Sequence, residues 1–144
     1  MSMDSAELAA IAATLRRGTT RLGRRLRAER PDTSLSSNKI VVLGHLHRRG
    51  PASPGAIAAA ERQQPQSLTR VFAELERDGL ITRTTSPDDR RAAVLGLTEQ
   101  GLGALVADMA ERDAWLAGAL TDLTPAEARM LRIAGELMER LAGE

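Results

Sequence analysis

The feature that most constrains this chain is the change of apolar period after Gly79. Over residues 65–78, apolar side chains recur at the three-, four- and seven-residue steps of a helix. These side chains are Leu68, Val71, Phe72 and Leu75. Two strand-like runs follow, residues 80–84 and 93–97, joined by a turn rich in proline and aspartate. Because two strands alone are marginally stable, we expect this hairpin to pack against helices.

Two more helices are predicted just upstream. The first spans residues 36–49 and ends at Gly50-Pro51. Its expected inner side comprises Ile40, Val41, Leu43, Leu46 and His47. Ser53-Pro54 then supplies an N-cap followed by proline at the first helical position, which predicts a short helix to about residue 60.

Long amphipathic helices are predicted on both sides of this centre. The first spans residues 4–29, is capped by Asp4 or Ser5, and ends at Pro31-Asp32-Thr33. Its apolar stripe is narrow, which is typical of a helix that packs against a partner chain. The stripe consists of Leu8, Ile11, Leu15, Leu22 and Leu26.

Two helices are expected after the hairpin. Thr98 is the predicted N-cap of the first, and the segment 124–127 forms a capping box that opens the second. We expect five apolar residues of the first helix to face inward: Leu102, Leu105, Val106, Met109 and Leu116. The second helix carries the apolar residues Met130, Leu131, Ala134, Leu137, Met138 and Leu141.

Composition excludes several classes of protein. The chain has no cysteine, which excludes disulfides and thiolate chemistry, and only Trp115 and Phe72 are aromatic, which disfavours an all-β sandwich. No apolar run approaches the roughly 20 residues of a membrane span. The first residues place acids before the apolar stretch and arginines after it, the reverse of a signal peptide. We therefore expect a cytoplasmic protein that does not enter a membrane.

Charge is unevenly distributed although the formal net charge is only +1. Residues 1–100 carry 16 basic and 11 acidic side chains, and residues 101–144 carry 4 basic and 8 acidic ones. This asymmetry is a weak indication of an anionic partner. The arginines from Arg16 to Arg30 are read as a solvated helix flank in preference to a nucleic-acid surface.

No arrangement of residues indicates an enzyme, a metal or a cofactor. The chain lacks a nucleophile elbow, a phosphate-binding loop and a dinucleotide fingerprint. His45 and His47 diverge on a helix because they are two residues apart, so they are poor joint metal ligands. A buried, hydrogen-bonded core histidine is the preferred reading for one of the two.

The order helix, short helix, helix and hairpin is that of a winged helix-turn-helix. A helix of this width fits the major groove of DNA, and the face opposite its apolar side carries Gln66, Thr69 and Arg70. Glu74 is expected to be exposed and without a specific role. The turn carries Arg90 and Arg91, which suit a narrow minor groove. We expect Asp89 to pair with Arg91 and brace it; a merely solvated tip is the alternative.

The segment 67–101 resembles the MarR (multiple antibiotic resistance regulator) family of bacterial transcription factors. The family pattern is roughly T-R-x-x-x-x-L-E-x-x-G-L-[IV]-x-R, then D-x-R and L-T-x-x-G. The matching residues are Thr69-Arg70, Leu75-Glu76, Gly79-Leu80-Ile81, Arg83, Asp89, Arg91 and Leu97-Thr98-Glu99-Gln100-Gly101.

The resemblance implies one MarR-like domain over residues 1–144, mainly α with a small β-hairpin wing. Its winged helix would span about 36–98, and the helices at about 4–30 and 99–142 would form an obligate homodimer. Its partner would be double-stranded DNA with a pseudo-palindromic operator, and many members release it when a small phenolic or anionic ligand binds. The expected DNA-binding residues are Gln64, Gln66, Ser67, Thr69, Arg70, Arg83, Arg90 and Arg91.

One departure from the family pattern precedes the predicted recognition helix. Members commonly carry Leu-Gly where this chain has Glu61-Arg62, followed by Gln63-Gln64-Pro65. We therefore expect a longer or differently packed turn there. Together with the modest net charge, this departure keeps open a second reading, a winged-helix protein-interaction module without DNA binding. Binding to random duplex DNA at low salt separates the two.

Overall fold

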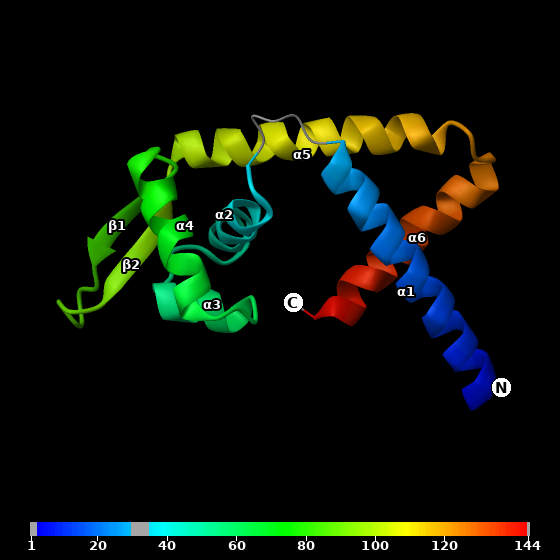
Figure 1. Ribbon diagram of the computed structural model, residues 1–144, viewed down its shortest axis with the longest axis horizontal. Helices are drawn as coiled ribbons and strands as arrows, with labels where there is room; N and C mark the ends of the chain where they lie inside the picture. The colour runs from blue at the N-terminus through cyan, green and yellow to red at the C-terminus, as the bar shows by residue number, and fades with distance from the viewer. Residues whose placement is uncertain (1–2, 30–34, 144) are drawn as a thin grey trace. The chain divides into compact units, whose positions relative to one another are not determined.

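The computed structural model describes residues 3–29 and 35–143. In chain order its elements are α1 (Ser5–Ala28), α2 (Ser37–Arg49), α3 (Pro54–Ala60), α4 (Pro65–Arg77), β1 (Ile81–Thr85), β2 (Ala93–Leu97), α5 (Glu99–Leu120) and α6 (Pro125–Ala142) (Figure 1). The predicted class, mainly helical with one small hairpin, is confirmed. The chain forms two compact units, residues 32–110 and residues 1–31 with 111–144, so the boundary falls within α5.

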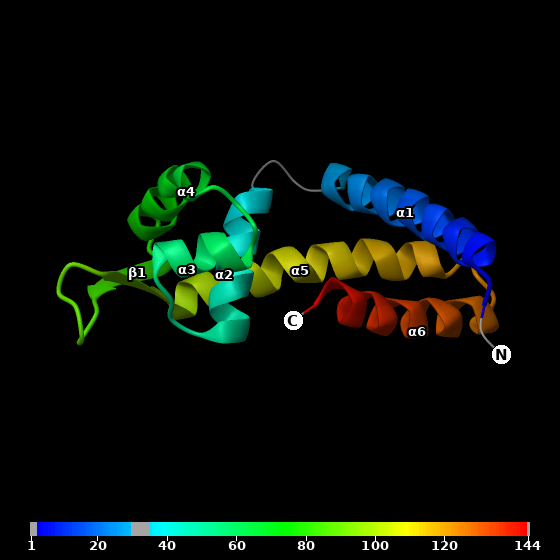
Figure 2. The ribbon, with the colours of Figure 1, turned by 90° about the horizontal axis from the view of Figure 1, so that it is seen from below.

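The unit 32–110 has a continuous apolar core. Helices α2, α3 and α4 cluster together in it (Figure 2), and each contributes buried side chains at helical spacing. The core residues are Val42, Leu43, Leu46, Ile57, Ala58, Leu68, Phe72, Leu75, Leu80, Ile81, Leu95 and Leu105. The predicted apolar face of α4 is therefore confirmed for Leu68, Phe72 and Leu75, while Val71 is half-buried.

The hairpin of β1 and β2 is antiparallel, with Ile81 opposite Leu97 and Thr85 opposite Ala93. Its strands begin and end within one residue of their predicted positions. Ala52 forms an isolated antiparallel bridge to β2: its N–H donates to the carbonyl of Leu95 at 3.1 Å, and the N–H of Leu95 donates to the carbonyl of Ala52 at 2.8 Å. This pairing and the buried Leu95 explain how so small a sheet stays attached to the helices.

The predicted helix caps are confirmed. Side-chain oxygens of Asp4 and Ser53 accept hydrogen bonds from the first turns of α1 and α3. Ser36, a cap that was not predicted, does the same for α2. The hydroxyl of Thr98 accepts from the N–H of Gly101 at 2.9 Å, and Thr124 forms the capping box of α6 with Glu127. Short polar side chains satisfy N–H groups that have no partner inside the helix, which is why these positions could be found in the sequence.

Two expectations about burial are wrong. His47 is exposed rather than on the inner side of α2, because the core contacts the face that carries His45 instead. Val106 and Met109 of α5, which were expected to face inward, are exposed in the single chain. Arg30 and the predicted helix end at residues 31–33 lie outside the described residues.

The unit of residues 1–31 and 111–144 differs from the unit 32–110 in the burial of its side chains. None of its described residues is buried. Large apolar side chains are instead exposed along α1 and α6; they are Leu8, Ile11, Leu22, Met130, Leu131, Ile133, Leu137 and Leu141. No helix in the described ranges combines the length and the apolarity that a membrane crossing requires.

Candidate nucleic-acid interface

The outward face of α4 is polar and open. Gln66, Ser67, Thr69 and Arg70 are exposed, while the opposite face of the helix is buried in the core. Gln64, also exposed, is the N-cap residue and makes no side-chain cap bond. The hydroxyl of Thr69 donates to the carbonyl of Pro65 at 3.1 Å, which leaves its oxygen lone pairs as acceptors for an outside donor.

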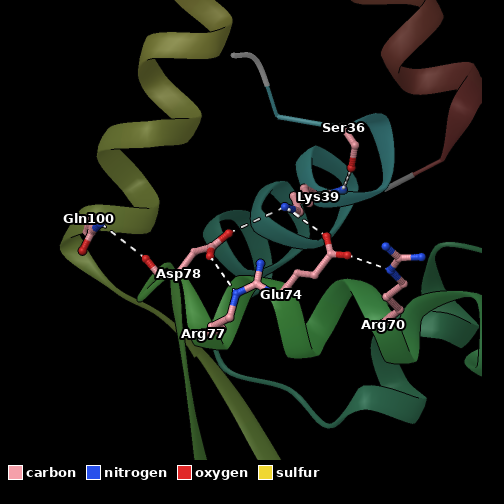
Figure 3. A network of polar contacts seen from close by, with 7 residues as sticks. All are labelled: Ser36, Lys39, Arg70, Glu74, Arg77, Asp78 and Gln100. Atoms are coloured by element: carbon pink, nitrogen blue, oxygen red, sulfur yellow. Dashed lines mark hydrogen bonds and ion pairs between the residues drawn. The ribbon is translucent and has the colours of Figure 1, made fainter. Parts of the chain in front are cut away.

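A polar network ties the outward face of α4 to α2 (Figure 3). Arg70 donates through Nε to Glu74 Oε1 at 2.8 Å, and Lys39 Nζ lies 3.1 Å from Glu74 Oε2. The hydrogen bond from Arg70, followed by the one from Lys39, lowers the pKa of Glu74. Glu74 is therefore a half-buried, ionised link between helices, contrary to the expectation that it is exposed and without a specific role.

The same network continues to the end of α4. Lys39 Nζ also lies 3.7 Å from Asp78 Oδ2, and Arg77 donates to Asp78 Oδ1 at 3.2 Å. The side-chain amide of Gln100, in the first turn of α5, donates to the carbonyl of Asp78 at 3.4 Å (Figure 3). The i,i+4 spacing of Arg70 and Glu74 is visible in the sequence, but the approach of Lys39 depends on the packing of α2 against α4.

The hairpin projects past the helices of its unit (Figures 1 and 2). The predicted arginines lie in the turn between β1 and β2. Arg90 and Arg91 are exposed and form no ion pair with any described residue. Asp89 Oδ1 accepts from the backbone N–H of Arg91 at 2.9 Å rather than pairing with its guanidinium. Asp89 therefore shapes the turn and leaves both arginine side chains available, which corrects the predicted side-chain pair.

Arg83 differs from the arginines of the tip. It lies in the middle of β1, opposite Leu95, and donates through Nε to Glu76 Oε2 at 3.1 Å. This contact joins the hairpin to α4. Arg83 is still exposed, so its remaining guanidinium N–H groups stay available to a ligand.

The turn between α3 and α4 shows the consequence of the departure at Glu61-Arg62. Arg62 has a φ of 51°, the left-handed region that glycine adopts most easily. Glu61 Oε1 lies 3.0 Å from Nδ1 of the buried His45 and 3.6 Å from Arg48. These contacts to α2 hold the turn in place. The prediction that one of the two histidines is buried and hydrogen-bonded is confirmed for His45. No cluster of three metal-ligating side chains occurs in the described part of the chain.

The comparisons with known proteins agree on one family. The family model described as MarR family matches residues 35–93. An uncharacterized HTH-type transcriptional regulator of Mycobacterium bovis, Mb0904, is 35% identical over 136 residues, which cover 94% of this chain and 95% of that protein. The transcriptional repressor MdtR of Bacillus subtilis is 33% identical over 96 residues, covering 67% of this chain and 61% of MdtR.

A solved structure extends the likeness to the fold. The crystal structure of a candidate transcriptional regulator from Pseudomonas aeruginosa PA01 superposes with a TM-score of 0.82 at 35% identity, covering 98% of this chain and 99% of that one. The relatives named here are regulators of transcription rather than enzymes. Sequence motifs, helix order and hairpin agree with these matches, and the chain therefore belongs to the MarR family of DNA-binding, winged helix-turn-helix transcriptional regulators.

Proposed function

We propose that this chain acts in the cytoplasm as a homodimer that binds a pseudo-palindromic operator and represses transcription. In this proposal α4 lies in the major groove and the arginines of the hairpin tip enter the adjacent minor groove. The observation that carries the proposal is that one unit presents a polar, exposed helix face and an exposed hairpin tip whose arginines form no ion pair with any described residue. That combination suits a polyanionic surface with readable base edges.

The homodimer is supported by the second unit. Its described residues include none that is buried, yet α1 and α6 carry apolar stripes. Contiguous exposed apolar faces of this kind mark interaction sites because their burial is the main source of association energy. A second copy of the chain supplies matching stripes, and a two-fold axis would set two copies of α4 about one helical turn of DNA apart.

Repression and release are the finer parts of the proposal. The relative MdtR is described as a repressor, which favours that direction of control here. The family resemblance further suggests that a small phenolic or anionic effector lowers DNA affinity. An apparent loss of operator binding on addition of such a compound, measured by gel shift, would support this part.

The wing provides the direct test of DNA binding. Arg91→Ala should weaken binding to a selected operator duplex by about 5- to 30-fold, because a charge-assisted contact to DNA is lost. Arg132→Ala is the matched control, since it removes the same charge from the polar side of α6. Fluorescence anisotropy measures both variants, and light scattering checks that the dimer persists.

Two results would count against the proposal. Equal affinity of wild type and Arg91→Ala would remove the wing from the interface. Failure of wild type to bind either selected or random duplex at low salt would favour a winged-helix protein-interaction module instead.

A further inference from the structure

Three Arg–Glu pairs at i,i+4 spacing occur among the described residues, and one of them is built differently. In Arg25–Glu29 and Arg132–Glu136 the donor is a terminal guanidinium nitrogen, and no other described residue holds the carboxylate. In Arg70–Glu74 the donor is Nε, at 2.8 Å, and Lys39 from another helix holds the second carboxylate oxygen. The pair on the recognition helix is therefore anchored by the fold.

Helix geometry alone does not explain this pair. An acidic residue that precedes its basic partner by four positions is the favoured order, and in all three pairs the arginine comes first, so spacing and order do not distinguish Arg70–Glu74 from the other two. The Lys39 side chain is only 18% exposed and that of Glu74 26%, whereas the side chain of Arg70 is 89% exposed. The acid is held at the protein surface by a half-buried lysine, and the guanidinium extends from it into solvent (Figure 3).

The choice of Nε determines what Arg70 can still bind. A guanidinium has five N–H groups, and the bond to Glu74 occupies the one on Nε. The two terminal nitrogens then bond no other described residue, and they point in the same direction as a fork. Such a fork matches the O6 and N7 acceptors on the major-groove edge of guanine.

The charges around Glu74 are also compatible with an Arg70 that faces DNA. A carboxylate on a DNA-facing helix would ordinarily repel phosphates. Here Arg70 and Lys39 both bond Glu74, and their hydrogen bonds lower its pKa, so it stays ionised and paired near neutral pH. Its negative charge is compensated on the protein side before DNA arrives.

We propose that Glu74, anchored by Lys39, is a positioning residue that orients the terminal nitrogens of Arg70 toward the edge of a guanine base. This inference rests on the proposed DNA-binding function and adds a base preference to it. Glu74 touches no base itself; it restricts the rotamers of Arg70 before binding, so less conformational freedom is lost on recognition.

The test begins with a duplex selected from a randomised library by the wild-type protein, compared with a scrambled duplex of the same length and composition. Arg70→Ala should reduce the affinity ratio of selected to scrambled duplex by about 5- to 100-fold. Glu74→Ala should reduce the same ratio by about 3- to 10-fold, and by nothing further when Arg70 is already alanine. Glu136→Ala, which breaks a pair of the same spacing on α6, is the matched control and should leave the ratio unchanged.

A modified base separates positioning from general effects. Replacing guanine by 7-deazaguanine, one position at a time in the selected duplex, removes the N7 acceptor. At one position in each half-site, wild type should lose about 3- to 10-fold in affinity, whereas Arg70→Ala should lose nothing. Glu74→Ala should respond less than wild type. Glu74→Gln keeps an oxygen acceptor and should be intermediate, which also provides a second variant if alanine impairs folding.

The outcomes that overturn the inference differ from those that overturn the function. If Glu74→Ala raises affinity for both duplexes equally, the carboxylate only repels phosphate, and the positioning role is wrong. If Arg70→Ala weakens both duplexes equally, Arg70 contacts phosphate rather than guanine. If wild type fails to distinguish the two duplexes at all, the proposed function itself fails.

Discussion

Gly101 is the glycine at which an added side chain would meet the closest neighbouring atom. A Cβ at this position would overlap the carbonyl oxygen of Leu80, which is backbone and cannot rotate away. The close approach lets the hydroxyl of Thr98 donate to the carbonyl of Gly79 at 2.7 Å, joining the start of α5 to the end of α4. Only a residue without a side chain fits there.

We predict that Gly101→Ala lowers the free energy of unfolding by more than about 2 kcal/mol, because the backbone of Leu80 must shift. Gly103→Ala, two residues along the same helix, is the control, since a Cβ there meets no atom within 4 Å. It should raise stability by about 0.5–1 kcal/mol through helix propensity. Urea denaturation at fixed protein concentration measures both, and equal effects would show that the close approach is not formed.

Some contacts of the candidate site follow from local sequence and others do not. Exposure of Gln66, Thr69 and Arg70 followed from the helical spacing of the core residues on the opposite face. The partner of Glu74 could not be found in the same way, because Lys39 is 35 positions away and no local pattern links them. The prediction that His47 lies on the inner side of α2 is wrong because a helical period does not say which side of a broad apolar face meets the core.

The capping box of α6 is the clearest case of an element fixed by its own sequence. The backbone N–H of Thr124 donates to Glu127 Oε2 at 2.8 Å, and the Thr124 hydroxyl accepts from the N–H of Glu127 at 3.3 Å. The hydrogen bonds from the side chain and backbone of Thr124 lower the pKa of Glu127. The box stabilises the first turn of α6 by satisfying N–H groups that the helix leaves open.

We predict that Thr124→Ala lowers the free energy of unfolding by about 1 kcal/mol at pH 7, and that Thr124→Ser restores most of it. Thermal unfolding followed by circular dichroism checks the pair. An alanine variant as stable as wild type would show that α6 does not depend on its cap.

Glu127 makes the free energy of unfolding depend on pH, and the direction of that dependence follows from its lowered pKa. Its pKa is lower in the folded than in the unfolded state, so its contribution is complete above its unfolded pKa and is lost as the pH falls through the folded one. Wild type should therefore be more stable than Glu127→Gln at pH 7, and the difference should disappear as the pH falls below the lowered, folded-state pKa of Glu127. Melting temperatures measured from pH 7 to pH 3 test this, and a difference that persists under acid would contradict it.

At the scale of the whole molecule, the two units obtain their stability differently. Residues 32–110 bury a continuous apolar core, whereas no described residue of the other unit is buried. Apolar side chains of α6 lie on one side of the helix, with Ile133, Leu137 and Leu141 all exposed in the single chain. This arrangement is the physical basis of the proposed dimer.

We predict that Leu137→Glu converts the dimer to monomer and weakens operator binding by tenfold or more, because a charge would be buried in the apolar contact and two copies of α4 would no longer act together. Arg132→Ala shifts the net charge by the same amount on the polar side of α6 and should remain dimeric. Sedimentation velocity gives the mass, and a Leu137→Glu protein that stays dimeric would move the interface elsewhere.

The sequence by itself determined the helices, the hairpin and the family, because apolar spacing, caps and the motif over residues 67–101 act between near neighbours in the chain. Tertiary structure alone decided which histidine is buried, that Asp89 bonds the backbone rather than the side chain of Arg91, and that Lys39 anchors Glu74. Those outcomes depend on distances between residues far apart in sequence or on the conformation of a turn. Packing fixes these distances and conformations, whereas periodicity does not.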